Sequence, residues 1–469
     1  MGTYLNPGKQ SYQMAVNSEI FVDKTEMIQY LNSLVNTQQR FVSVSRPRRF
    51  GKTMAADMIC AYYDREAESR ELFEKRKLAE CETNKTLKKE LAWDAYLGKF
   101  DVVRLVMTDF MAGCDTVREM LRYLTDEVTE ELIDENPDIK FGNRITLRTV
   151  MNKIYGKTKR QFVIVIDEWD AIFRTWKNDI TGQTEYLDFL RDWLKDKPYV
   201  ALAYMTGILP IKKYGEHSAL NMFAEYSMVS PKNLAKYVGF TSDEVRTICE
   251  DKKLDFNAMK EWYDGYRISN IPTAELNHDS AEQDCQDVYE IYSPLSVVSA
   301  ALFRRLENYW NKTETYEALA EYIRKDYDGL KEAVAYLMDG GRLVIDTSTY
   351  QNDMTTFHGR DDVLSLLIHL GYLGYDNKKS EVFIPNREIL DEFRTSTKGD
   401  EWVPAFRSFA RSQEIVKATW EKDAGKVAEL LEEAHNTAAN ITYNDEAALS
   451  YAVQLAFYAA QKYYTTKDH

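Results

Sequence analysis

Three consecutive residues of this chain have the types needed to hold a phosphate group and a metal ion. Gly51 is followed by Lys52 and Thr53. In a phosphate-binding loop, backbone N–H groups and a helix N-terminus face the phosphate, a lysine reaches the β- and γ-phosphates, and a hydroxyl binds Mg²⁺. The usual pattern, G-x-x-x-x-G-K-[ST], puts its first glycine where this chain has Arg46. The motif by itself therefore leaves two interpretations open, a phosphate loop and a chance G-K-T.

Two carboxylates follow the apolar run Phe162–Ile166 directly, as Asp167 and Glu168. One carboxylate at such a place can hold Mg²⁺ through water, and the other can orient and deprotonate an attacking water. Alternatively, the two acids only face solvent at the end of a buried strand, but this leaves their pairing with a G-K-T unexplained. Together the two motifs predict binding of ATP with Mg²⁺, and hydrolysis is the further hypothesis.

Strands and helices must position these residues. Thr53–Asp64 and Tyr186–Lys195 carry apolar residues at helical spacing. Five apolar segments are expected to be strands: Arg40–Ser45, Phe100–Met107, Phe162–Ile166, Val200–Met205 and Glu225–Val229. Strands that alternate with helices predict a parallel sheet covered on both faces, which is an α/β fold.

This alternation stops at about Pro231, and four regions are predicted. They are a P-loop core at 1–235, a helical lid or accessory domain at 236–331, a winged-helix-like module at 332–398 and a helical segment at 399–469. A polar loop is expected around Ile271–Gln286. The winged-helix-like interpretation depends on the order of elements: a helix, the turn Gly340-Gly341, a helix ending at His369, two short strands (Gly371–Asp376 and Glu381–Pro385) and a further helix.

Composition narrows the class of protein. The net charge of −15 argues against a protein whose main task is coating nucleic acid, because that binding depends on neutralising phosphates. The longest apolar runs are too short to cross a bilayer, and no charged-then-apolar leader opens the chain, so a cytoplasmic location is expected. Five widely spaced cysteines without a C-x-x-C indicate reduced thiols.

Several further motifs resemble those of the bacterial AAA-ATPase-like family, a P-loop group in which the C-terminus often carries a restriction-endonuclease-like nuclease domain. The matching motifs lie between about Tyr12 and Thr313: F-V-D-K-T (21–25), R-P-R-R-F-G-K-T (46–53), V-I-D-E-W-D (165–170), M-T-G-I-L-P-I (205–211), V-G-F-T-S-D-E-V (238–245), W-Y-D-G-Y (262–266) and I-Y-S-P-L-S-V (291–297). An arginine at position 46 is usual in such a family, so the departure from the generic motif supports this resemblance.

The resemblance implies a role for each matching residue. Lys52 is the phosphate ligand, Thr53 and Asp167 hold Mg²⁺, Glu168 is the catalytic base, and Thr206 is a polar sensor near the γ-phosphate. The run that holds the nucleotide's phosphates comprises Arg46, Pro47, Arg48, Arg49, Phe50, Gly51, Lys52 and Thr53. The implied strand order is 5-1-4-3-2, which puts Thr206 between the two motifs.

Other residues have two interpretations. Asp23 and Thr25 either flank the base of the nucleotide or form an N-cap pair for a helix at Glu26–Leu34, and the second is favoured. Arg48, Arg49 and Lys212 are candidates for γ-phosphate contact, although exposed arginines are commonly only solvated. The W-Y-D-G-Y and Y-S-P-L-S runs are interpreted as packing between a lid and the core.

A nuclease domain of the kind found in the resembling family needs a helix glutamate, an aspartate and an E-x-K. Glu446, at the start of an expected helix Glu446–Tyr464, looks like the helix glutamate, or else an ordinary acid favoured at a helix N-terminus. Only five residues follow Tyr464, so no nuclease activity is expected of this chain.

Three functions compete at this point. The first is an ATPase whose hydrolysis moves the lid and the C-terminal modules, and the second is a nucleotide-gated interaction module without turnover. The third is a nucleic-acid-associated ATPase subunit, which has the weakest support because the last helix of the winged-helix-like module offers only Arg387 and Arg394 as basic residues. A protein partner or a homo-oligomer is compatible with the first two, and no membrane is expected.

Overall fold

The fold is described from a computed structural model of the chain. The described residues are 2–80, 92–143, 145–211, 220–269, 288–310, 316–324, 327–351, 354–438, 457 and 459–460. Within these ranges, no helix is both long enough and apolar enough to span a membrane. Ile271–Gln286, Lys212 and Glu446, for which the sequence suggested a loop and two functional roles, lie outside them.

A five-stranded parallel sheet forms the core of the N-terminal half. Its strands are β1 (Phe41–Ser45), β2 (Asp101–Val106), β3 (Phe162–Asp167), β4 (Val200–Gly207) and β5 (Ala224–Tyr226). Their order is β2-β3-β4-β1-β5, and all four neighbouring pairs are parallel. This is the predicted order 5-1-4-3-2 read from the other edge, so the predicted α/β sheet is confirmed.

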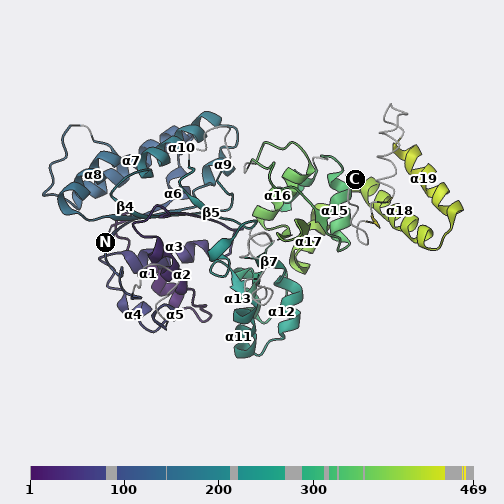
Figure 1. Ribbon diagram of the computed structural model, residues 1–469, viewed down its shortest axis with the longest axis horizontal. Helices are drawn as coiled ribbons and strands as arrows, with labels where there is room; N and C mark the ends of the chain where they lie inside the picture. Colours follow the sequence, from purple (N-terminus) through teal and green to yellow (C-terminus); the bar gives the residue numbers. More distant parts are fainter. Residues whose placement is uncertain are drawn as a thin grey trace, which may run out of the picture.

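Helices cover both faces of this sheet (Figure 1). One face carries α1 (Gln10–Val16), α2 (Glu26–Leu34), α3 (Lys52–Tyr63), α4 (Arg70–Phe73) and α5 (Lys77–Glu80). The other carries α6 (Met107–Met111), α7 (Val117–Asp134), α8 (Leu147–Thr158), α9 (Ala171–Thr175) and α10 (Ile180–Leu194). Every residue of β1, β3 and β4 is buried, because apolar side chains on both sides of these strands meet a helical layer.

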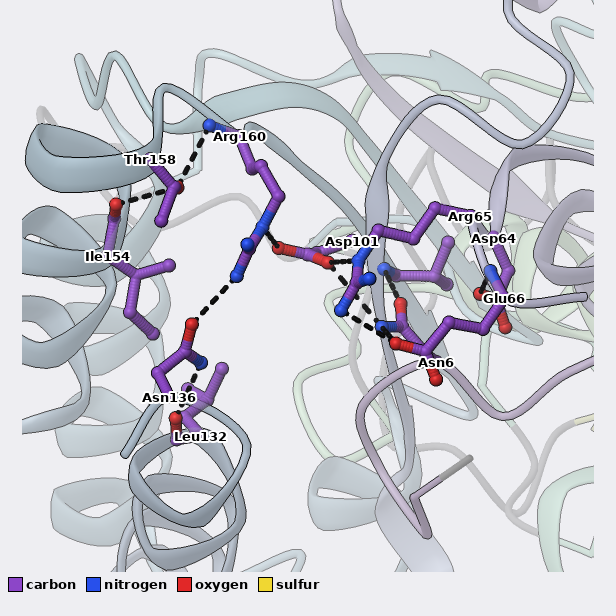
Figure 2. Close-up of polar contacts among 11 residues, drawn as sticks. Asn6, Asp64, Arg65, Glu66, Asp101, Leu132, Asn136, Ile154, Thr158 and Arg160 are labelled. Atoms are coloured by element: carbon purple, nitrogen blue, oxygen red, sulfur yellow. Dashed lines mark hydrogen bonds and ion pairs between the residues drawn. The ribbon is translucent and has the colours of Figure 1, made fainter. Parts of the chain in front are cut away.

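A cluster of polar residues closes the amino end of the sheet, where β2 begins (Figure 2). The Asp101 carboxylate is buried, and its two oxygens pair with the guanidinium groups of Arg65 and Arg160. Asn6 donates to the same carboxylate at 3.4 Å and accepts from the Val102 N–H at 2.8 Å. The cluster therefore ties the N-terminal segment and the start of β3 to the first residue of β2.

The region after β5 contains strands as well as the expected helices. Its helices are α11 (Ser242–Lys252), α12 (Phe256–Tyr263) and α13 (Pro294–Phe303), preceded by a short 3₁₀ turn at Lys232–Leu234. A small antiparallel sheet, β6-β8-β7, was not predicted: β6 is Phe240–Thr241, β7 is Tyr266–Ser269 and β8 is Val288–Tyr292. These strands are short, and Tyr266 pairs with Ile291 far along the chain, so local patterns indicate them weakly.

The next region contains the helices and strands expected there, and one further strand. It comprises α14 (Tyr316–Ile323), α15 (Leu330–Met338), β9 (Leu343–Val344), α16 (Arg360–Leu370), β10 (Gly374–Asp376), β11 (Glu381–Phe383) and α17 (Arg387–Ser396). The added strand, β9, completes an antiparallel sheet of order β10-β11-β9. After a 3₁₀ turn at Asp400–Trp402, α18 (Val403–Trp420) and α19 (Ala424–Ala438) extend away from the sheet (Figure 1).

Candidate functional site

The two sequence motifs meet at the carboxyl end of the parallel sheet. In the β1–β4 register Ser45 lies opposite Gly207, and the Arg46 N–H donates to the Gly207 carbonyl at 3.1 Å. In the β3–β4 register Ile166 lies opposite Met205. Ligands of open parallel sheets bind outside the carboxyl ends of the strands, so this is the expected edge for a site.

The loop after β1 ends at the N-terminus of α3. Gly51 has φ +85°, a left-handed conformation that glycine adopts without steric cost, and Lys52 is the first helical residue. The Lys52 ammonium is buried and donates to the carbonyl oxygens of Arg46 at 3.0 Å and Pro47 at 2.8 Å. Burial lowers the pKa of Lys52 to about 8, against the opposing influence of Asp170 and Asp167. The ammonium therefore lies in the field of the carboxylates beyond β3.

Arg46 replaces the usual first glycine of the loop, and its side chain is fully buried. Nη1 donates to the Ser45 carbonyl at 2.9 Å and to the Tyr226 carbonyl on β5 at 3.1 Å. Burial lowers the pKa of this guanidinium to about 10. These contacts join the start of the loop to the edge strand, which is a supporting function for a residue that was expected to bind the nucleotide.

The four residues between Arg46 and Gly51 divide into two pairs. Arg48 and Arg49 are exposed, and Arg49 has φ +67°. Pro47 and Phe50 are buried, and the Phe50 ring lies edge-on to Tyr266 at a centroid distance of 5.2 Å. The two arginines therefore lie on the outside of the loop, whereas Pro47 and Phe50 pack inside the protein.

Asp167 and Thr206 form a buried pair at the ends of β3 and β4. The Thr206 hydroxyl donates to Asp167 Oδ1 at 2.6 Å, and the Glu168 N–H donates to the same oxygen at 3.0 Å. Both side chains are at most 1% exposed. Thr206 was expected to be a γ-phosphate sensor, and the contact seen here is with the carboxylate of Asp167.

Glu168 has φ +53°, an uncommon backbone conformation for a residue with a side chain. Such strain clusters at functional sites, where the surrounding structure imposes it. The Glu168 side chain is 41% exposed, so its carboxylate is open to water.

Two further charged residues at this edge were not predicted from the sequence. Asp170 is fully buried, and its Oδ2 accepts from the Ile208 and Leu209 N–H groups at 3.1 and 2.9 Å. Arg174 pairs with this oxygen at 3.1 Å and with Glu168 at 3.4 Å. Asp170 stood in the V-I-D-E-W-D motif, and Arg174 follows it at i+4, so a search for helical charge pairs would have found them.

The donor types at this edge fit Mg²⁺, which prefers oxygen ligands and is usually held by one or two protein groups with several waters. Thr53 lies in the first turn of α3 with an exposed side chain. Asp167 uses Oδ1 for its hydrogen bonds, and within the described residues Oδ2 has no recorded partner. No group of three or more acidic, histidine or cysteine side chains suited to a metal occurs among the described residues.

An apolar pocket opens beside the N-terminal half of α3. It is lined from both sides of the chain by Tyr12, Phe21, Val22, Lys24, Phe50, Gly51, Met54, Ala55, Met58, Tyr237, Gly239, Phe240 and Pro294. Lys24 precedes β1 in the sequence, and its ammonium pairs with Glu244 of α11, in the region after β5, at 2.5 Å. The pocket thus joins the segment before β1 to the region after β5.

Asp23 is adjacent in sequence to this pocket, but its carboxylate is engaged within the chain. Oδ1 accepts from the N–H and hydroxyl of Thr25 at 2.9 and 2.7 Å, and Oδ2 accepts from the Lys77 N–H at 2.9 Å. The helix α2 starts at Glu26, directly after Thr25. Thr25 makes no side-chain capping hydrogen bond to α2, so the N-cap pair favoured from the sequence is not formed as predicted, and Asp23 instead binds Thr25 in the turn before the helix.

The basic residues of α17 are occupied inside the chain. Arg387 lies over the Trp262 ring at 4.4 Å and pairs with Glu261 at 3.5 Å, while Arg394 pairs with Asp391 at 3.1 Å. The same helix buries two acids, Glu388 and Glu392. These contacts give no support to binding of DNA by this helix.

Comparison with known proteins adds one informative match. Residues 8–215, which include β1 to β4 and both motifs, match a family model described as a predicted AAA-ATPase, and so support a P-loop ATPase core in this part of the chain. Among curated proteins, none matches this chain. Solved structures include the Aeropyrum pernix ORC2 protein in ADPNP–ADP complexes, similar at 9% identity over 83% of this chain and 97% of that chain, with a TM-score of 0.28. A likeness at that TM-score carries no weight for fold or function.

Proposed function

We propose that the chain binds ATP at the carboxyl edge of the parallel sheet and hydrolyses it with Glu168 as the base. The observation that carries this proposal is the meeting of two motifs from distant parts of the sequence. The ends of β1 and β3 flank β4 at the same edge of the sheet, so the loop that leads to Lys52 lies beside Asp167, the last residue of β3, and Asp170 just after it. A G-K-T that occurred by chance would not be expected to lie beside two acids from a distant part of the sequence.

In this proposal each side chain acts on a defined part of the reaction. The backbone at Gly51 and the Lys52 ammonium hold the β- and γ-phosphates, and Arg48 and Arg49 approach the γ-phosphate from the exposed side of the loop. Thr53 and Asp167 hold Mg²⁺, which when bound neutralises charge on the phosphate oxygens. Glu168 takes a proton from the attacking water, while Thr206 keeps Asp167 in place.

The apolar pocket beside α3 is the proposed place for the adenine base. It offers aromatic and aliphatic surface within reach of the same helix N-terminus that faces the phosphates. Because its far wall comes from Tyr237, Gly239, Phe240 and Pro294, a bound base would contact both the sheet domain and the region after it.

Direct packing of the phosphate loop supports coupling of hydrolysis to the rest of the chain. Phe50 packs against Tyr266, and the Tyr266 hydroxyl donates to the Gly371 carbonyl at 2.5 Å. Gly371 itself lies so close to Pro47 that an added Cβ would be 2.7 Å from the proline ring. A change in the conformation of the loop after β1 would therefore alter its contacts with β7 and with the end of α16. Such a change fits the proposed movement of the modules after the core.

Calorimetric titration with Mg²⁺-ATP, run alongside phosphate release, tests the proposal. Lys52→Ala is expected to abolish binding, because it removes the cation of the phosphate site. Glu168→Gln is expected to retain binding and lose turnover. The exposed residues Lys99 and Glu135 provide matched controls, as Lys99→Ala and Glu135→Gln, which are expected to behave as wild type. Absence of ATP binding by the wild-type chain would refute the proposal.

A nucleotide-gated module without turnover is the second candidate. The pairing of Glu168 with Arg174 favours it, since one oxygen of this carboxylate is already engaged by a side chain of the same protein. Tight binding of ATP with no phosphate release, together with an ATP-dependent change in mass, would select this alternative.

A further inference from the structure

Arg174 occupies a central place among the charges at the carboxyl edge of the sheet. It lies on α9, the short helix that follows β3, and its side chain is 12% exposed. Its Nε contacts Asp170 Oδ2 at 3.1 Å, and its Nη2 contacts Glu168 Oε2 at 3.4 Å. One guanidinium thus bridges two carboxylates, a geometry that suits its planar set of donors.

The two carboxylates differ in how firmly they are held. Asp170 is fully buried, and its Oδ2 is fixed to the chain after β4 by two backbone N–H groups. The Glu168 carboxylate is partly exposed, and Arg174 is the one side-chain partner recorded for it within the described ranges. Arg174 is therefore anchored at one end by Asp170 and presents its other nitrogen to Glu168.

We propose that Arg174 is a positioning residue, which holds the Glu168 carboxylate in one orientation through the chain Asp170, Arg174 and Glu168. This inference rests on the proposed function, in which Glu168 activates water. A glutamate side chain has several rotatable bonds, so an exposed and unsupported carboxylate would sample many orientations. The strained backbone at Glu168 aims the side chain, and the guanidinium holds its end.

A double-mutant cycle in steady-state ATP hydrolysis tests this role. Arg174→Gln is expected to lower kcat by about 10–100-fold, the size of effect seen when an outer-shell partner of a functional group is removed. KM for ATP is expected to change less than twofold, because Arg174 does not contact the nucleotide in this proposal. In the Glu168→Gln background, Arg174→Gln is expected to have no further effect on kcat, since the group that it orients is already gone.

Two further variants guard against a loss of folding. Arg174→Lys retains a charge for Asp170 but cannot bridge both carboxylates, so it is expected to unfold like wild type and still lose about tenfold in kcat. Arg191→Gln, on the exposed side of α10, removes an arginine that pairs with Asp188 and is expected to leave kcat unchanged.

The outcomes separate this inference from the function on which it rests. A wild-type chain without turnover would overturn both. A wild-type chain that hydrolyses ATP, with kcat unchanged by Arg174→Gln, would overturn the role of Arg174 alone. An equal loss of kcat in the wild-type and Glu168→Gln backgrounds, or a rise in KM at constant kcat, would also overturn it, because the guanidinium would then act independently of Glu168.

Discussion

The buried carboxylates at the two ends of the parallel sheet differ in how many of their oxygens have partners. At the amino end, both oxygens of Asp101 pair with arginines, and Asn6 adds a third donor (Figure 2). At the carboxyl end, Asp170 has one oxygen with three donors and another, Oδ1, that is buried with no hydrogen-bond partner among the described residues. Asp167 likewise uses one oxygen for both of its recorded hydrogen bonds.

The difference shows which carboxylates still have an oxygen available to bind a ligand. A carboxylate whose two oxygens are both matched by cations can stabilise the fold but has little left to offer a ligand. Native proteins rarely leave buried polar atoms without partners, and such atoms often mark functional sites. The amino end is thus a structural clamp, and the carboxyl end is the place to look for chemistry.

Removing the clamp is expected to have the largest effect. Asp101→Ala leaves Arg65 and Arg160 without their shared partner, and we expect a loss of about 3 kcal/mol in the free energy of unfolding. This is at the low end for a buried ion pair, because both arginines are about one-third exposed and water can solvate them. Urea denaturation measures it, with the exposed Asp138→Ala as control. A folded variant should retain the wild-type kcat, and a selective loss of kcat would contradict the assignment of this end as structural.

A further buried carboxylate, in the C-terminal part, extends the comparison to a site where the hydrogen-bond donors among the described residues are neutral. Glu388 of α17 accepts hydrogen bonds from the Ser296 hydroxyl and from the Tyr309 and Trp310 N–H groups. Burial raises its pKa from 4.5 to about 7, helped by the nearby Glu392. These donors are neutral, and through Ser296 the Y-S-P-L-S run is joined to α17, which lies in the region predicted to be winged-helix-like and not in the core.

The raised pKa makes this junction sensitive to pH. A group with a higher pKa in the folded state stabilises below its unfolded pKa, and this contribution is lost as pH rises through about 7. Glu388→Gln is expected to remove that part of the pH dependence and to be more stable than wild type at pH 8 by roughly 2–3 kcal/mol. Thermal unfolding between pH 5 and 8 measures it. Parallel curves for the two proteins would show that Glu388 is charged throughout.

At the carboxyl end, Asp167→Asn is expected to act on chemistry and not on stability. Asparagine retains an oxygen for the Thr206 hydroxyl and the Glu168 N–H, but it loses the charge proposed to hold Mg²⁺. We expect phosphate release to fall by about 10–100-fold, with the free energy of unfolding changed by less than about 1 kcal/mol. A destabilisation as large as that of Asp101→Ala would make the two ends alike and remove the contrast between them.

The smallest expected effect is at the contact between the loop after β1, proposed to bind phosphate, and the region after β5. Tyr266→Phe retains the ring against Phe50 and removes one buried hydrogen bond to Gly371, so we expect a loss of about 1 kcal/mol in the free energy of unfolding. Tyr155→Phe provides a control at a half-buried tyrosine whose hydroxyl has no hydrogen-bond partner among the described residues. If the two variants unfold alike, the hydroxyl contributes nothing to holding the loop against this region.

The strands and helices with the strongest local patterns could be predicted from the sequence alone. The apolar run Phe162–Ile166 predicts a strand buried on both faces, and Gly51 directly before Lys52 predicts a helix N-terminus at the loop; both are confirmed. The strand order followed from the resemblance of the motifs. Short strands such as β6 and β9 were missed, because two residues carry almost no periodic signal.

Only the tertiary structure decided how the individual side chains are used. Residue type alone does not tell which of Arg46, Arg48 and Arg49 is buried, and only the structure shows Arg46 held inside the protein by a hydrogen bond to the Tyr226 carbonyl of β5. The contacts of Arg174 with Glu168, of Thr206 with Asp167, and of Tyr266 with Gly371 depend on distances that no local pattern encodes. Residue types and spacing specify which chemistry is available, but burial and orientation arise only when strands and helices from distant segments pack together.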